Sequence, residues 1–280
     1  MNKTNSLLLA GVLSATLMTS LNVRAEEAAA AAPASPHTLT TNVGLYTDYI
    51  FRGISYAKEK GSIQGGVDYS NTNGLYAGVW SSNVDSDPYA INGNTMEIDL
   101  YGGYVHTFNP DLSLNLGALY YYYPNSKKLG TGYSANSVDL TAALTYKYFT
   151  LKYSYMPTKY FGFRDSQGSG YTEFNVNYPV AQLAGLNLTA HIGHQYIEGS
   201  GAFDGFGNPA VTSNSIYDYT DWQVGVNKDF AIASSTGWNA GLSYIDTDAR
   251  KTYQDVGAWS YSDGFKPGES KVLGYIKRTF

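Results

Sequence analysis

From Leu39 onward the sequence alternates between apolar and polar residues with a period of two, and this pattern constrains the fold most strongly. Successive side chains of a β-strand point to opposite faces, so the alternation predicts strands with one apolar and one polar face. Clusters of Gly, Asn, Asp, Pro and Ser interrupt the pattern and predict turns, and no convincing helix is found. About twelve strands are predicted, near residues 39–52, 62–71, 74–83, 95–107, 112–123, 136–148, 150–156, 171–179, 186–197, 218–230, 236–246 and 271–280.

Alternation alone also fits a soluble β-sandwich, in which one face packs on a core and the other meets water. The lengths of the connections separate the two folds, because short links such as 71–73 and 109–111 alternate with longer ones such as 53–61 and 124–135. This alternation is typical of outer-membrane barrels, which have tight periplasmic turns and long extracellular loops. The sequence therefore predicts an all-β protein, a transmembrane antiparallel up-and-down β-barrel of about 12 strands.

Aromatic residues gather near the predicted strand ends, as expected of girdles at the two membrane interfaces. Those beside the long loops are Tyr49, Phe51, Tyr120, Tyr122, Tyr153, Tyr155, Tyr196 and Tyr244. Those beside the short turns are Tyr69, Phe108, Tyr146, Tyr148, Tyr178 and Phe230. We expect these side chains, including Tyr49 and Phe51 of the first strand, to face lipid.

Residues 1–25 have the features of a secretory signal peptide. An apolar stretch runs from Leu7 to Leu21 and is followed by Val-Arg-Ala, so cleavage is expected after Ala25. A membrane anchor is the weaker alternative, because a spanning helix needs about 20 apolar residues. Residues 26–38 form an Ala- and Pro-rich periplasmic spacer, and the barrel is expected over residues 39–280.

Charge and cysteine content exclude several classes of function. The formal net charge is −5 and becomes more negative once the signal peptide is removed, which argues against nucleic acid as a partner. Charged residues make up 15% of the chain, below the roughly 25% of soluble domains. The chain has no cysteine, so it forms no disulfide and no thiolate metal site.

Four segments resemble a known family: Asp48–Ser55 (DYIFRGIS), Ile63–Ser70 (IQGGVDYS), Gly74–Asp85 (GLYAGVWSSNVD) and Glu97–Tyr104 (EIDLYGGY). They are similar to the TorF-type porins, also known as the Gcw_chp conserved proteins of proteobacteria. The resemblance begins near Thr41, runs to the end of the chain and is densest over the first four strands. It implies an outer-membrane barrel with a transport role and does not indicate a substrate.

If the apolar face of each strand meets lipid, the charged residues of the other face point into the lumen. Twelve strands lie between small filled barrels and the wide channels of 16-stranded porins, so the sequence predicts a narrow pore. Acids outnumber bases among the candidates, which mildly favours cations, but an ion-pair network that plugs the barrel is the alternative. The pore-lining candidates are Asp48, Arg52, Asp68, Glu97, Asp99, Asp139, Lys147, Lys152, Glu173, His191, Asp221 and Lys277.

Arg52 and its neighbours in the first four predicted strands suggest a constriction near the outer end of the lumen. Our hypothesis is that Arg52 pairs there with Glu97 or Asp99. The alternative is that these residues are separately solvated by lumen water.

Catalysis is not predicted. His191 faces the predicted lumen and His194 does not, so the two cannot act together, and no partner for His191 can be chosen from the sequence. The chain contains no G-x-S-x-G, H-E-x-x-H or P-loop motif, and neither a metal nor a cofactor is expected.

The sequence therefore favours a porin of the cell outer membrane that passes small hydrophilic solutes. The alternative is a non-conducting surface barrel, acting as an adhesin, a receptor or a structural protein. Expected partners are membrane lipid, lipopolysaccharide and small solutes. The last strand ends at Phe280, which resembles the signal read by the outer-membrane assembly machinery, although Arg278 departs from the usual apolar residue two places earlier.

Overall fold

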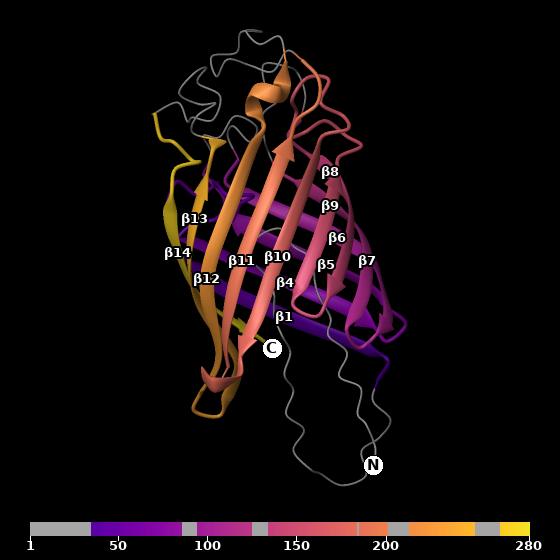
Figure 1. The fold of residues 1–280 in the computed structure, drawn as a ribbon, viewed down its shortest axis with the longest axis vertical. Helices are drawn as coiled ribbons and strands as arrows, with labels where there is room; N and C mark the ends of the chain where they lie inside the picture. The colour runs from indigo at the N-terminus through magenta and orange to yellow at the C-terminus, as the bar shows by residue number, and fades with distance from the viewer. Residues whose placement is uncertain (1–34, 86–93, 125–133, 184, 201–212, 250–263) are drawn as a thin grey trace.

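The computed structural model describes residues 35–85, 94–124, 134–183, 185–200, 213–249 and 264–280. In this part of the chain twelve strands form a closed antiparallel barrel (Figure 1). The predicted fold class is confirmed. The signal peptide, its cleavage after Ala25 and residues 26–34 of the spacer lie outside the described residues and stay predictions.

The barrel wall is a simple meander. Each strand pairs with its neighbours in sequence, and β1 closes the ring against β14, with Leu45 opposite Ile276, so that no edge is left unpaired. The wall strands are β1 (His37–Tyr46), β4 (Ser62–Asn71), β5 (Leu75–Asn83), β6 (Met96–Asn109), β7 (Leu112–Tyr122), β8 (Ser137–Tyr146), β9 (Phe149–Tyr155), β10 (Gly170–Val180), β11 (Leu186–Tyr196), β12 (Tyr219–Ile232), β13 (Ser235–Thr247) and β14 (Lys271–Thr279). The remaining elements are the two-residue strands β2 (Ile50–Phe51) and β3 (Ile54–Ser55) and the 3-10 helices η1 (Ala181–Leu183) and η2 (Asn214–Tyr217).

The outer surface of the barrel is apolar. Leu39, Ile63 and Val272 are 68%, 62% and 59% exposed, and similar side chains point outward from the other wall strands. A continuous apolar band of this kind far exceeds the patches that soluble monomers expose. Because the closed ring also pairs the wall backbone internally, the barrel is suited to span a membrane. None of the helices in the described ranges is long and apolar enough for a membrane span.

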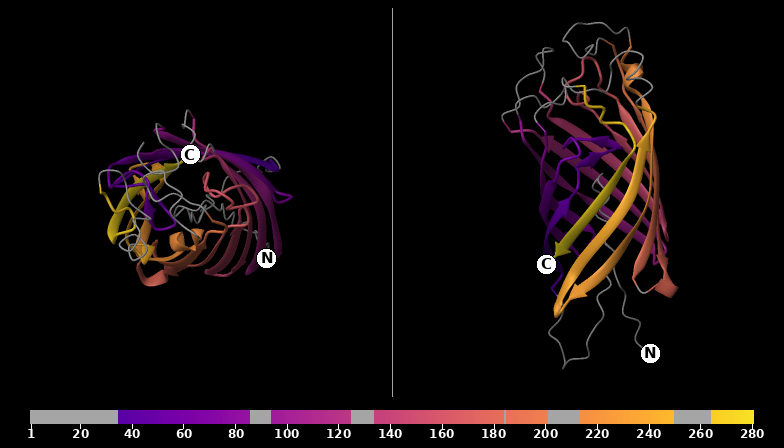
Figure 2. Two further views of the ribbon diagram at one scale, coloured as in Figure 1. Left: turned by 90° about the horizontal axis from the view of Figure 1, so that it is seen from above. Right: turned by 90° about the vertical axis from the view of Figure 1, so that its left-hand side faces the viewer.

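The two ends of the barrel differ. The connections β4–β5, β6–β7, β8–β9, β10–β11 and β12–β13 are short and lie at one end, together with the end of β14 (Figure 1). The longer connections gather at the opposite end, which the two views of Figure 2 show from above and from the side. The sequence predicted both the short connections at one end and the longer connections at the other. The outward position of Tyr120, Tyr122, Tyr153, Tyr155 and Tyr244, which are 37–44% exposed, is also confirmed.

The first strand is shorter than predicted. It ends at Tyr46 rather than near residue 52, and residues 50–55 form a separate small hairpin. Tyr49 and Phe51 are 2% and 3% exposed, so the prediction that they belong to a lipid-facing girdle is wrong. The physical reason is that an interior hairpin alternates in the same way as a wall strand, so a period of two cannot tell them apart.

Candidate functional site

A β-hairpin crosses the interior of the barrel near its long-loop end. Residues 48–57, here called the interior hairpin, are all buried. Arg52 and Gly53 form its two-residue turn with φ of 48° and 77°, as a primed hairpin turn requires. Gly53 has no room for a side chain, because a Cβ there would lie 2.5 Å from the Cβ of Asp221 and 2.6 Å from Cγ2 of Thr247. The tip of the hairpin therefore rests against strands β12 and β13.

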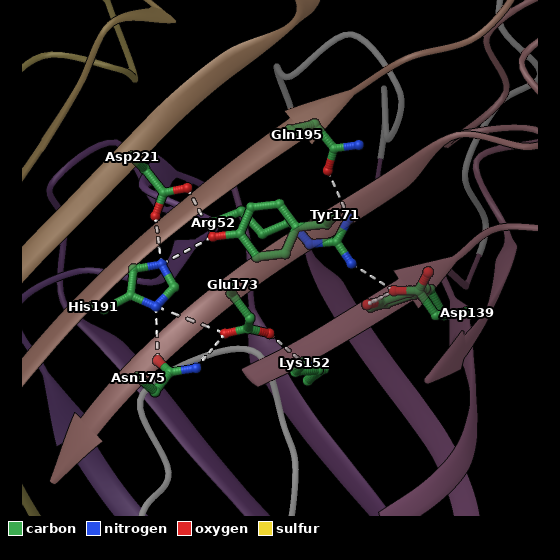
Figure 3. Close-up of polar contacts among 10 residues, drawn as sticks. Arg52, Asp139, Lys152, Tyr171, Glu173, Asn175, His191, Gln195 and Asp221 are labelled. Carbon is green, nitrogen blue, oxygen red and sulfur yellow. Dashed lines mark hydrogen bonds and ion pairs between the residues drawn. The ribbon is translucent and has the colours of Figure 1, made fainter. Parts of the chain in front are cut away.

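Arg52 anchors the tip to two further wall strands. One guanidinium nitrogen lies 2.6 Å from Oδ2 of Asp139 on β8, and the other donates to Oε1 of Gln195 on β11 at 2.6 Å (Figure 3). The amide of Gln195 is oriented by donating to the carbonyl of Gly170, so its oxygen faces Arg52. The guanidinium also lies over the ring of Tyr171 at 4.5 Å. Paired and stacked in this way, Arg52 holds the hairpin across the lumen.

The predicted partners of Arg52 are wrong. Arg52 pairs with Asp139, whereas Glu97 accepts a hydrogen bond from the hydroxyl of Tyr49 at 2.9 Å. The prediction assumed that Arg52 continued the first wall strand, near the strand that carries Glu97 and Asp99. In the structure the turn takes Arg52 away from β1 to the opposite wall.

Aromatic side chains surround the interior hairpin. Tyr49 packs against Trp80 with ring centroids 5.3 Å apart, and Phe51 lies 5.7 Å from both Tyr121 and Phe161. The connection between β9 and β10 supplies part of this cluster. The buried aromatic residues of the cluster are Tyr49, Phe51, Tyr56, Trp80, Tyr121, Tyr123, Tyr160, Phe161, Phe163, Tyr217 and Tyr219. The sequence did not reveal this internal core, because its aromatic residues are divided between segments predicted as wall strands and segments predicted as loops.

A second polar network runs along the wall from β9 to β12. Lys152 pairs with Glu173 at 2.7 Å, and Asn175 donates to the other Glu173 oxygen (Figure 3). His191 lies 2.8 Å from a carboxylate oxygen of Asp221 and 2.7 Å from Oδ1 of Asn175. Each buried acid of this network thus has a hydrogen-bonding partner on a neighbouring strand, which offsets the cost of burying it.

This network gives His191 partners that the sequence could not choose. Tyr171 contacts both groups of the His191–Asp221 pair, donating to Asp221 at 2.7 Å. In the described part of the chain, the hydrogen bonds of His191 go to tyrosine, amide and carboxylate groups and to no serine. A serine-dependent hydrolytic arrangement is therefore not formed by these contacts.

The other candidates are spread along the interior. Asp48 accepts a hydrogen bond from the backbone N–H of Tyr49, and Asp68 accepts from Asn42 and Tyr101. Lys277 lies over the ring of Tyr275 on the same strand.

Lys147 is placed differently from the prediction. The strand expected to run to residue 148 ends at Tyr146, and Lys147 adopts a turn conformation with φ of 55°. Its ammonium group lies 3.6 Å from Asp111, and both side chains are about half exposed at the short-turn end. Lys147 therefore lies outside the interior. Its predicted inward orientation assumed that the strand continued to residue 148, whereas the strand ends before Lys147.

Among the described residues, no group of three or more His, Cys, Asp or Glu side chains is arranged to hold a metal ion.

Fold and interior together define a membrane-spanning β-barrel whose lumen is crossed by a hairpin. The chain belongs to the Gcw_chp family, described as "Bacterial protein of unknown function (Gcw_chp)", which it matches over residues 30–280. This confirms the Gcw_chp part of the predicted resemblance, while the TorF-type name stays a prediction. Among curated proteins no match to the chain is found.

Solved structures of porins resemble the barrel. The KdgM porin is 8% identical, with a TM-score of 0.50 over 86% of this chain and 99% of its own. The NanC porin is 9% identical, with a TM-score of 0.48 over 87% and 99%. OprD from Pseudomonas aeruginosa is 16% identical, with a TM-score of 0.38 over 86% and 65%. At these identities the likeness to the KdgM porin supports the fold alone.

Proposed function

We propose that this protein is an outer-membrane porin, a narrow passive channel for small hydrophilic solutes. One observation carries the proposal: the barrel wall has an apolar outer surface and a polar interior. Asn115, Asn187, Gln223 and Asn227 point inward from three different strands, where polar side chains would be costly unless they met water or each other. The fold shared with the KdgM porin supports the same class.

The interior hairpin forms the constriction of this channel. Its tip contacts β8, β11, β12 and β13, so it narrows the long-loop half of the lumen. A solute passes beside the hairpin or after its displacement. Discrimination by size and charge therefore takes place at this level of the barrel.

The channel mildly favours cations. Acidic side chains outnumber basic ones in the described interior, and a lumen with this balance attracts positive ions. The interior acids include Asp48, Asp68, Glu97, Asp99, Asp139, Glu173 and Asp221, and the interior bases include Arg52, Lys152, Lys271 and Lys277.

The proposal includes location and partners. The chain is exported after signal-peptide cleavage and inserted in the cell outer membrane, where its outer surface contacts lipid and its loops meet lipopolysaccharide. The assembly machinery reads the last strand, β14, together with Phe280, which follows it. Neither a catalytic reaction nor a cofactor forms part of the proposed function.

A non-conducting surface barrel is the second candidate, and one observation favours it. The aromatic cluster around the interior hairpin is a hydrophobic core of the kind that seals a barrel. A barrel sealed in this way would act through its long loops, as an adhesin, a receptor or a structural protein.

Planar-bilayer recording on refolded protein separates the two candidates. If the protein is a cation-favouring channel, we expect discrete conductance steps. In a salt gradient, we expect the reversal potential to shift toward the equilibrium potential of the cation. Absence of steps in several salts and at several voltages, from protein whose folding is shown by a heat-modifiable gel shift, would refute the channel and support the surface barrel.

A further inference from the structure

Glu97 and Asp99 form a pair of buried carboxylates without a basic partner. They stand two residues apart on β6, so both side chains point inward, and they are 1% and 2% exposed. In the described ranges neither forms an ion pair with a basic side chain, since Arg52 is committed to Asp139. A buried carboxylate pair is not stable with its charge uncompensated, so it must share a proton or hold a cation.

Unused hydrogen-bond acceptors point to the same position. Oε2 of Glu97 and Oδ1 of Asp99 are buried and accept no hydrogen bond. Tyr49 satisfies Oε1 of Glu97, and Tyr123 and Asp99 are further hydrogen-bonding neighbours of this carboxyl group. Buried polar atoms are nearly always paired, so two neighbouring carboxyl groups with open oxygens need either a shared proton or a bound cation between them.

The neighbours of the pair are aromatic. Asp99 lies directly opposite Trp80 on β5 and Tyr121 on β7, and both of these side chains are buried in the interior. Tyr49 of the interior hairpin packs on Trp80 with ring centroids 5.3 Å apart and donates its hydroxyl hydrogen bond to Glu97. Aromatic faces beside carboxylates attract ammonium groups, because the ring quadrupole and the negative charge act in the same direction.

A divalent metal fits this set poorly. Ca²⁺ takes 6–8 oxygen ligands and Mg²⁺ requires six in near-ideal geometry, whereas this site offers two carboxylates and apolar rings. An ammonium group needs only a few acceptors and gains from the aromatic faces.

We propose that Glu97 and Asp99, with Tyr49, Trp80 and Tyr121, form a binding site for a small protonated amine. This inference rests on the proposed channel function and deepens it, since it assigns a class of solute to the constriction. Each open carboxylate oxygen accepts an N–H of the ammonium group, and the rings contact its carbon substituents. Because Tyr49 closes the site, binding also involves the interior hairpin.

The test is cation-dependent stability of the refolded protein in detergent. Methylammonium chloride replaces N-methylglucamine chloride, whose cation is too bulky for the site, at constant ionic strength and pH. The midpoint of heat-induced unfolding should rise to a plateau, because a ligand that binds only the folded state stabilises it. The double variant E97Q/D99N should lower the apparent affinity about tenfold or more. D68N is the matched control, since it removes an interior acid that is already bonded to Tyr101 and Asn42, and should leave the response intact.

Three results would overturn the site. An unfolding midpoint that does not depend on the cation means that the pair shares a proton. An equal response in the wild type and in E97Q/D99N places the effect elsewhere. An equal response to K⁺ and to methylammonium means that the rings play no part. If the double variant does not refold, D99N and W80L are used in the same titration, and each should weaken the response.

Failure of the site and failure of the channel are distinguishable. Saturable methylammonium binding without conductance steps would refute the channel and keep the site. Conductance steps without saturable binding would keep the channel and refute the site.

Discussion

Arg52 and Asp139 form an ion pair of 2.6 Å that joins the tip of the interior hairpin to the barrel wall across 87 residues of sequence. Both side chains are 1% exposed, so water does not screen the attraction. Removing one member of such a pair leaves an uncompensated buried charge, at a cost of about 3–5 kcal/mol. This ion pair therefore helps to fix the position of the hairpin in the lumen.

Replacing Arg52 by Ala should release the interior hairpin. Asp139 then has no counter-charge beside it. Its carboxylate is stabilised more by contact with water than by contact with the docked hairpin, so release of the hairpin is favoured. Because the chain has no cysteine, S55C places a unique thiol at a hairpin position that is 0% exposed. The thiol should react with a maleimide at least about tenfold faster in R52A/S55C than in S55C alone, since tenfold corresponds to about 1.4 kcal/mol.

Lys147→Ala is the matched control for this measurement. It removes a basic residue from an ion pair that is about half exposed at the opposite end of the barrel, where such a contact contributes about 0–1 kcal/mol. K147A/S55C should react at the rate of S55C. Equal rates in R52A/S55C and S55C would show that Arg52 does not hold the hairpin.

Gly53→Ala should also displace the hairpin tip, for a steric reason. The added Cβ would lie 2.5 Å from Asp221 and 2.6 Å from Thr247, and φ of 77° is unfavourable for alanine. Gly264 has a similar φ of 86° but nothing within 4 Å of an added Cβ. G264A therefore carries the backbone strain without the clash, and only G53A should raise the labelling rate of S55C. A matching rise in G264A would assign the effect to backbone strain.

The wall of the barrel could be predicted from the sequence because its cause is local. Each wall strand places one face in lipid and one in the interior, and this requirement repeats along the chain as a period of two. The connections reveal the two ends in the same way, since turns such as that at Lys147 need few residues. The wall strands and their turns depend on residues that are close in sequence, so they can be predicted without knowledge of the tertiary structure.

The interior hairpin could not be predicted because its cause is not local. Tyr49 and Phe51 alternate as wall residues do, and only the contacts with Tyr121 and Phe161, far along the chain, hold them inside. The turn at Arg52 and Gly53 was visible as an Arg-Gly pair, but such a pair also begins an ordinary loop. The choice of Asp139 over Glu97 depends on where the hairpin points, which periodicity does not encode.

Glu173→Gln should destabilise the barrel by about 3–5 kcal/mol, because it leaves the buried ammonium group of Lys152 without its partner at 2.7 Å. The double variant K152M/E173Q should recover most of this loss, since it removes the buried charge together with its partner. The free energy of unfolding in urea and detergent measures both. Similar losses in the single and double variants would mean that the pair contributes through packing and not through charge.

Docking of the interior hairpin should weaken as the pH rises from about 4 to about 6. Burial raises the pKa of Asp48 to about 6, because the loss of water outweighs the hydrogen bonds and the attraction of Lys271 that favour the carboxylate. Between these pH values the docked hairpin keeps a proton that a released hairpin loses, so rising pH favours release. From about one pH unit above 6 the group is ionised in both states and adds no further dependence.

For this measurement the thiol is placed at Ala57, which is 2% exposed, because Ser55 hydrogen-bonds Asp48 and is kept. The A57C labelling rate, normalised at each pH to that of the unfolded protein, measures the change. It should rise several-fold between pH 4 and pH 6.5. Asp48→Asn removes the titrating group, and Glu59 and Lys271 remain nearby in both proteins. D48N/A57C should therefore show a flatter profile than A57C. Identical profiles would place the pH dependence on other groups and refute the role of Asp48.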